Sequence, residues 1–181
     1  MRIISGEKKG FRLYSLPGEK TRPTRDFVKE AIFSIIFDCE GMRVLDLYSG
    51  SGSLGFEALS RGASSLDLVD WSERAVRVMQ KNIDKLEFND LAKTHRARVD
   101  GFLKTSEERF DLIFADPPYD KNFVNRTISS IIETNALNVD GILIIEHSSK
   151  EEIDQKWARL INKQKQYGNT TVTFFTGVKD K

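Results

Sequence analysis

The chain has 181 residues, of which 39% are hydrophobic and 30% are charged. This size and composition fit one globular domain with a full core and exclude a disordered or fibrous protein. The only cysteine, Cys39, cannot form an internal disulfide, and no Cys/His cluster has the spacing of a zinc site. No apolar run has the length of a membrane span, and the N-terminus has no apolar signal-peptide core. We therefore expect a monomer in the reducing cytoplasm, with no membrane and no metal partner.

The net charge is only +1, but it is unevenly distributed along the chain. Residues 1–29 hold eight basic and three acidic side chains, a net charge of +5, whereas the remainder carries −4. A basic arm on a mildly acidic body is suited to local contact with a polyanion, although the same charges also occur on an ordinary solvated surface.

The first forty residues predict a small extension. The segment RIISGEKKGFRLYS favours two short strands about a Gly/Lys-rich turn, a β-hairpin. A loop follows, and Thr24 is the predicted N-cap of a helix that runs to about residue 37. The apolar residues of this helix recur at helical spacing: Phe27, Ala31, Ile32, Ile35 and Ile36.

From residue 43 onward, short apolar strands alternate with amphipathic helices. Strands are predicted at 43–49, 64–70, 94–99, 110–116 and 141–148, and helices at 53–61, 72–88, 101–107, 122–135 and 150–162. This alternation indicates an α/β fold, a mostly parallel sheet between layers of helices. The tail breaks the rhythm, because the turn signal Gly168-Asn169 separates two strands that we expect to form an antiparallel hairpin at one sheet edge, which makes seven strands.

The first chemical signal is a glycine motif. Gly50, Gly52 and Gly55 form a G-x-G-x-x-G between a predicted strand and a predicted helix. Glycines there let the backbone turn sharply and approach a ligand closely. Asp70 ends the next strand, 20 residues after Gly50, where a carboxylate can accept hydrogen bonds from ribose hydroxyls. The pair favours a cofactor that contains a nucleoside.

Two further acids narrow the choice of cofactor. Asp46 lies four residues before Gly50, where a buried anion would repel the pyrophosphate of a dinucleotide. S-Adenosylmethionine fits better, because it has an ammonium and a sulfonium together with an adenosine for Asp70; capping of loop amides by Asp46 is compatible with the same ligand. Asp100 follows the third strand in an Asp-Gly turn. As the third acid at one sheet edge, it can accept a hydrogen bond from an adenine amino group.

The segment ADPPYD, residues 115–120, follows the fourth predicted parallel strand at the point where ligands bind in open α/β sheets. Pro117 and Pro118 have no backbone N–H, so this turn is stiff and presents carbonyl oxygens without competing donors. The carboxylate of Asp116 and a neighbouring carbonyl suit an exocyclic amine, which has two N–H donors. Tyr119 can stack on the attached ring.

At this point the chain resembles a known family. LDLYSGSGSLGFEALSRGA (45–63) resembles motif I of the class I S-adenosylmethionine-dependent methyltransferases, and DPPY resembles the signature of those that methylate exocyclic amines of adenine or guanine. The basic hairpin, TRPTRDFVKEAIF, the glycine loop, DPPY, IIEHS and YGNTTVTFF occur in the same order as in the RsmD-type methyltransferases, which modify a guanine N2 in small-subunit (16S) ribosomal RNA. The departures are Tyr48-Ser49, where the family often has Phe-Ala, and Trp71, where a polar residue is usual.

The resemblance implies a Rossmann-like methyltransferase domain at 41–181 and an RNA-contacting extension of hairpin and helix at 1–40. It implies methyl transfer in line from the sulfonium to the amine, with the protein acting mainly by positioning, and a target base that leaves its stack. The implied catalytic residues are Asp116, Pro117, Pro118 and Tyr119. The implied cofactor-binding residues are Asp46, Ser49, Gly50, Gly52, Asp70, Trp71, Asp100 and Gly101. The implied RNA contacts are Arg2, Lys8, Lys9, Arg12, Arg22 and Arg25.

The expected function is therefore methylation of a guanine N2 in small-subunit ribosomal RNA, either naked or in a 30S assembly particle, during ribosome maturation. The main alternative is an N6-adenine methyltransferase acting on DNA or RNA, although 181 residues leave little room for a DNA target-recognition domain. A nicotinamide dehydrogenase and a non-catalytic RNA-binding module are weaker alternatives. The motifs do not identify the target nucleotide.

Overall fold

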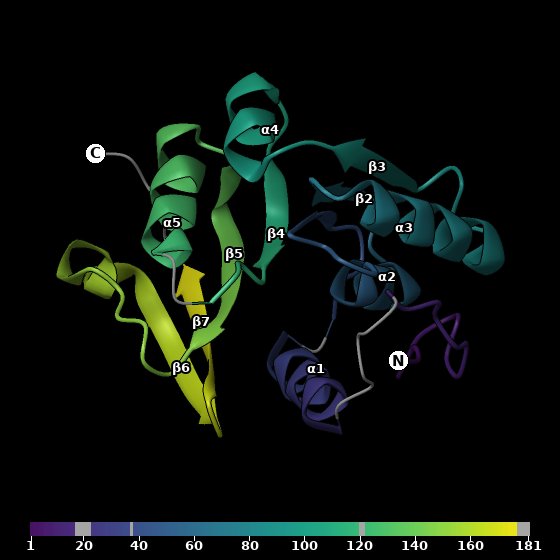
Figure 1. Ribbon diagram of the computed structural model, residues 1–181, viewed down its shortest axis with the longest axis horizontal. Helices are drawn as coiled ribbons and strands as arrows, with labels where there is room; N and C mark the ends of the chain where they lie inside the picture. Colours follow the sequence, from purple (N-terminus) through teal and green to yellow (C-terminus); the bar gives the residue numbers. More distant parts are fainter. Residues whose placement is uncertain (17–22, 37, 120–121, 177–181) are drawn as a thin grey trace.

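The computed structural model describes residues 1–16, 23–36, 38–119 and 122–176, and residues 23–25 by their backbone alone. Within these ranges a sheet of seven strands lies between two layers of helices (Figure 1). The strand order is β3-β2-β1-β4-β5-β7-β6. The strands are β1 (Arg43–Leu47), β2 (Ser65–Asp70), β3 (Ala92–Arg96), β4 (Phe110–Ala115), β5 (Leu137–Ser148), β6 (Ile161–Tyr167) and β7 (Thr170–Thr176).

Strands β1 to β5 are parallel, and β7 is antiparallel to both of its neighbours. The predicted mostly parallel sheet with a C-terminal antiparallel hairpin is therefore confirmed. Because the central strands are covered on both faces, their side chains are apolar at successive positions rather than at alternate ones. Residues 112–115 of β4, for example, are all buried.

The helices divide between the two faces. On one face lie α1 (Pro23–Ile36), α2 (Ser53–Ser60) and α3 (Glu73–Leu86); on the other lie α4 (Val99–Thr105), α5 (Phe123–Glu133) and the 3₁₀ helix η1 (Gln155–Leu160). Helix α3 begins after Ser72, whose hydroxyl accepts a hydrogen bond from the Ala75 amide, as the predicted N-cap does. Helix α1 begins at Pro23, one residue before the expected cap at Thr24, which suits the preference of proline for a first helical turn.

Two predicted elements are wrong in extent: strand β5, expected at 141–148, begins at Leu137, and one C-terminal helix is much shorter than expected. The expected helix at 150–162 is reduced to η1, because the side chain of Asn125 bonds the Glu152 carbonyl and the Asp154 amide and holds that segment non-helical. The expected N-terminal hairpin does form: Arg2 and Arg12 are bridged, and the amides of Ile3, Gly10 and Leu13 donate to the carbonyls of Phe11, Ile3 and Met1. Other backbone donors of this segment bind outside it.

Those donors bind α2. The Ile4 and Ser5 amides donate to the Glu57 carboxylate at 2.8 and 3.0 Å, and the Glu7 amide donates to the Ser60 carbonyl at 2.7 Å. Glu57 is fully buried and also accepts a hydrogen bond from Arg61, while Lys29 lies 3.7 Å away. Figure 1 shows the purple N-terminal segment beside α2. The extension is thus fixed to the sheet domain by a buried charge cluster.

In the part of the chain that the structure describes, no helix is both long enough and apolar enough to cross a bilayer.

Candidate active site

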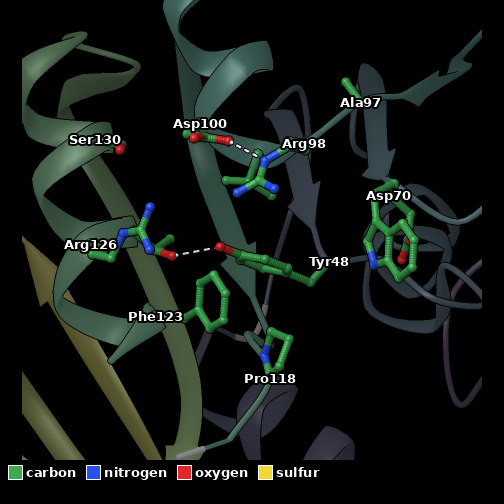
Figure 2. A pocket seen from close by; sticks show the side chains of 12 residues that line it. Tyr48, Asp70, Ala97, Arg98, Asp100, Pro118, Phe123, Arg126 and Ser130 are labelled. Atoms are coloured by element: carbon green, nitrogen blue, oxygen red, sulfur yellow. Dashed lines mark hydrogen bonds and ion pairs between the residues drawn. The ribbon is translucent and has the colours of Figure 1, made fainter. Parts of the chain in front are cut away.

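The carboxyl ends of the parallel strands meet at one edge of the sheet. The chain runs outward from β1 to β3 and then returns to β4 on the other side of β1, so β1 and β4 form the topological switch point at which α/β sheets bind ligands. A cavity of about 410 Å³ opens here (Figure 2). Its walls are residues that follow β1 to β4 and residues of α5: Tyr48, Asp70, Trp71, Ala97, Arg98, Val99, Asp100, Pro118, Phe123, Arg126, Thr127 and Ser130.

A smaller cavity of about 80 Å³ adjoins the glycine loop. It is lined by acids from three strands together with residues of the loop and of the N-terminal extension: Met1, Lys29, Asp46, Tyr48, Ser49, Gly50, Ser51, Ser53, Leu54, Asp116 and Glu146. Tyr48 lines both cavities, so the two cavities adjoin each other at this residue.

The glycine loop has the conformation that its sequence requires. Gly50 and Gly52 have φ values of 56° and 78°, in the left-handed region that glycine adopts without strain. A Cβ atom on Gly52 would lie 2.5 Å from a ring carbon of Phe56, so this position also lacks space for a side chain. Ser49 is directed inward, because its hydroxyl donates to the Asp46 carbonyl and accepts from the Val69 amide.

Asp70 holds the glycine loop through hydrogen bonds to backbone amides. One carboxylate oxygen accepts a hydrogen bond from the Gly50 amide at 3.0 Å, and the other accepts from the Ser72 amide at 2.8 Å. The side chain also lines the larger cavity (Figure 2). Trp71 itself is 72% exposed, at the rim of that cavity.

Asp46 is a buried carboxyl at the penultimate position of strand β1. It accepts a hydrogen bond from the Gly55 amide at 3.0 Å and is only 4% exposed. Burial raises the pKa of Asp46 to about 8, although the Gly55 hydrogen bond opposes the shift and the negative charge of Asp70 adds to it. A cation bound in the smaller cavity would therefore favour ionisation of Asp46.

Asp100 lies in the first turn of α4 on the wall of the larger cavity (Figure 2). Partial burial opposes ionisation, but the hydrogen bond and positive charge of Arg98, 3.4 Å away, lower the pKa of Asp100 from its ordinary value. An ionised acceptor thus faces the cavity. Gly101 follows it in the helix, and a Cβ there would meet no atom within 4 Å, so this glycine is not required by space.

The segment 116–119 divides between the two cavities. Asp116 lines the smaller one and Pro118 the larger one, while Pro117 is buried between them in the chain. Tyr119 is 40% exposed, and its hydroxyl donates to Glu146 at 3.2 Å and lies 3.2 Å from the hydroxyl of Thr170. Burial of the hydroxyl, with the nearby charges of Glu146 and Asp116, raises the pKa of Tyr119 to about 12. The phenol therefore stays protonated.

The basic arm presents some of the expected cations to solvent. The side chains of Arg2, Lys9 and Arg12 are exposed. Lys8 instead packs on the body, where its ammonium pairs with Glu7 and Glu87 and lies over the Phe88 ring. Two further predicted RNA contacts are not covered. Arg22 lies outside the described residues, and Arg25 is described by its backbone alone.

Several residues of the two cavities were not predicted. Tyr48 has a φ of 58°, which is unusual for an aromatic residue, and its hydroxyl lies 2.9 Å from that of Thr127 on α5. Phe123 and Arg126 join the same wall of the larger cavity (Figure 2). Lys29 and Glu146 line the smaller cavity. Lys29 and Glu146 are charged residues among apolar neighbours in α1 and β5, and this contrast is the sequence signal that could have indicated them.

His147 has no place in either cavity. It is buried, and its two ring nitrogens lie 2.9 Å from the Ser148 carbonyl and the Thr173 hydroxyl. Burial lowers its pKa, so it is a neutral structural residue. Among the described residues, no group of three His, Cys, Asp or Glu side chains is arranged to hold a metal.

The strand order, the glycine loop and the acids at the carboxyl edge define a Rossmann-like methyltransferase of class I. A solved structure described as "Putative methyltransferase yhhF from Escherichia coli" superposes with a TM-score of 0.85 over 98% of this chain and 97% of that one, at 26% identity. The chain belongs to the family described as "Conserved hypothetical protein 95", whose model matches residues 1–176.

Two curated relatives extend along nearly the whole chain. A Bacillus subtilis (strain 168) protein named "Putative rRNA methyltransferase YlbH" is 38% identical over 97% of this chain and 98% of its own length. A Haemophilus influenzae protein named "Ribosomal RNA small subunit methyltransferase D" is 32% identical over 90% of this chain and 88% of its own length. The family resemblance inferred from the motifs is confirmed.

Proposed function

We propose that this protein transfers a methyl group from S-adenosylmethionine to the exocyclic N2 amine of a specific guanine in small-subunit (16S) ribosomal RNA. The observation that carries the proposal is the position of Asp116 to Tyr119 beside the acid-lined cavities at the switch point. Relatives named as small-subunit ribosomal RNA methyltransferases support the choice of substrate.

The residues at the switch point fit the proposed cofactor. The larger cavity is within the range of roughly 300–1,000 Å³ that is usual for a cofactor-sized ligand. Asp70 and Asp100 would accept hydrogen bonds from a ribose and an adenine amino group, and Asp46 would hold an ammonium near the glycine loop. S-Adenosylmethionine, when bound, supplies a methyl group that is already activated by a sulfonium.

The residues of the DPPY segment would position the target amine. The Asp116 carboxylate and the Pro117 carbonyl would each accept one N–H of the amine, which directs the nitrogen lone pair toward the methyl donor. Pro117 and Pro118 have no amide hydrogen that could compete for these acceptors. The exposed face of Tyr119 would stack on the base, and Asp116 or solvent would accept the proton that the amine releases.

The N-terminal extension would hold the RNA. We propose that residues 1–40 form an RNA-contacting extension and residues 41–181 the methyltransferase domain. Met1 lines the smaller cavity and the next residue, Arg2, is exposed, so the basic arm would begin where a flipped base enters. Arg2, Lys9 and Arg12 would contact phosphates, together with Arg22 and Arg25. We expect a monomer that acts in the cytoplasm, where small subunits are assembled.

The test is transfer of labelled methyl from S-adenosylmethionine to small-subunit ribosomal RNA, offered both as naked RNA and as assembled 30S particles, followed by nucleoside analysis. N2-methylguanosine at one site is the expected product. N6-methyladenosine would replace the proposed substrate with adenine, and no incorporation into either substrate would overturn the function. Asp116→Asn, which keeps the size of the side chain but removes its charge, should lower the rate by at least about a hundredfold.

A further inference from the structure

Glu146 lies beside Asp116 at the carboxyl edge of the sheet. Ala115 of β4 is paired in register with Ile145 of β5, so Asp116 and Glu146 occupy the next position on adjacent parallel strands. Side chains alternate between faces along a strand, and Phe114 and Ile144 pack on the same face as α1 to α3. Asp116 and Glu146 therefore point to that face together, and both line the smaller cavity.

The direction of the Glu146 carboxylate is set by Tyr119 and β7. The Tyr119 hydroxyl donates to Glu146 Oε1 at 3.2 Å. Because a phenol has only one hydrogen, Thr170, whose Oγ1 is also 3.2 Å away, donates to Tyr119 in turn. Thr170 is paired in register with Ser148, two residues beyond Glu146. The ring proposed to stack on the base and the Glu146 carboxylate are thus held as one unit.

We propose that Glu146 makes the enzyme specific for guanine by accepting a hydrogen bond from its N1–H. In guanine, N1–H and the C2 amine are adjacent donors on one edge of the ring. Two neighbouring carboxylates match this edge, with Asp116 on the amine and Glu146 on N1–H. Adenine has an unprotonated N1 beside its amine, so its lone pair would face the Glu146 carboxylate. The proposal rests on the proposed function and adds the selection of the base.

The experiment compares guanine with 2-aminopurine at the methylated position of the RNA. The analogue keeps the C2 amine but has no hydrogen on N1, so the wild-type enzyme should prefer guanine by about a hundredfold or more in kcat/KM. Glu146→Gln keeps the size of the side chain and an oxygen for Tyr119, but its amide can donate to an unprotonated N1. The preference should fall to within about tenfold, since the variant loses activity on guanine and gains on the analogue.

Thr170→Val is the matched control. It removes the other hydroxyl partner of Tyr119 but leaves the Glu146 carboxylate, so it should lower kcat/KM for both RNAs while the preference for guanine persists. Thermal melting and binding of S-adenosylhomocysteine check that both variants are folded. If Glu146→Gln is inactive on both RNAs, the ratio of their dissociation constants, measured with S-adenosylhomocysteine present, replaces the kinetic ratio.

An unchanged ratio in Glu146→Gln, by kinetics or by binding, would overturn the role of Glu146 even if total activity falls, because a merely structural residue affects both RNAs equally. A wild-type enzyme that forms no N2-methylguanosine would instead overturn the proposed function itself.

Discussion

Asp46 and Asp70 hold the glycine loop at its two ends. Asp46 accepts a hydrogen bond from the Gly55 amide and Asp70 accepts one from the Gly50 amide, each at 3.0 Å. The loop between them is therefore fixed by two acidic side chains that also line the two cavities. Because Asp46 is buried and its pKa is raised to about 8, its protonation changes with pH in the physiological range.

Cofactor affinity should depend on pH through Asp46. The pKa of Asp46 is raised to about 8, so below that pH an ammonium can pair with it only after the carboxyl releases a proton. The affinity for S-adenosylhomocysteine, which has the same ammonium, should rise up to about tenfold per pH unit from pH 6 to 8 and level off above. Calorimetric titration should show proton release. Asp46→Asn should bind more weakly with a flat profile, and a retained slope in that variant would exclude Asp46 as its source.

The same group should make the free protein less stable as pH rises. In the unfolded chain Asp46 has its ordinary pKa near 3.8, so between about pH 4 and 8 the folded protein binds a proton that the unfolded chain does not. The contribution of Asp46 to the free energy of unfolding must therefore fall as pH rises through this window. Urea unfolding at pH 5 and pH 8 measures the difference, which should be smaller in Asp46→Asn than in the wild type.

Two glycines of the predicted cofactor site should respond oppositely to alanine. Gly52→Ala places a side chain in the left-handed region and against the Phe56 ring, so the free energy of unfolding should fall by about 1–3 kcal/mol. Gly101→Ala adds a methyl group inside α4, where no atom lies within 4 Å, and should raise it by about 0.5–1 kcal/mol. Equal effects in denaturant titrations would mean that the loop conformation does not depend on glycine.

The location of the site could be predicted from the sequence because it depends on strand order. Asp46, Asp70, Asp100 and Asp116 each lie at or near the carboxyl end of a predicted parallel strand, and these ends meet at one edge of the sheet. The partners of these residues could not be predicted. That Asp70 would bond the Gly50 amide, or that Tyr119 would contact Glu146 and Thr170, depends on tertiary distances that residue spacing does not contain.

The errors in the fold have a similar origin. The expected helix at 150–162 is interrupted because Asn125, more than twenty-five residues away, bonds the Glu152 carbonyl and the Asp154 amide. The N-terminal hairpin forms as expected, but the sequence did not show that its Ile4, Ser5 and Lys8 amides bind Glu57 and Ser60, more than fifty residues away. Glu57 itself stands in the sequence as an ordinary helical glutamate, and only the structure identifies it as the buried centre of a charge cluster.

The attachment of the extension should depend on Glu57. Glu57→Gln keeps the shape of the side chain but leaves Lys29 and Arg61 without their buried counter-charge, so the free energy of unfolding should fall by about 3–5 kcal/mol. Hydrogen exchange at the Ile4 and Ser5 amides should accelerate more than in the sheet. Glu73→Gln is the control, because Glu73 pairs with arginines at the surface and should contribute less than about 1 kcal/mol. Similar losses in both variants would contradict a special role for the cluster.

The salt dependence of RNA binding should reflect the exposed cations of the extension. Each phosphate contact releases condensed counterions, so neutralising one contact lowers the slope of log affinity against log salt by about 0.7–0.9. Arg2, Lys9 and Arg12 are exposed near the N-terminus, and replacing all three by glutamine should lower the slope by about 2 to 3. Lys104→Gln serves as the control, because this exposed lysine lies on α4 on the opposite face of the sheet. Filter binding of the ribosomal RNA fragment at several salt concentrations measures the slopes. If the triple variant keeps the wild-type slope, the arm does not contact phosphates and its charges belong to an ordinary solvated surface.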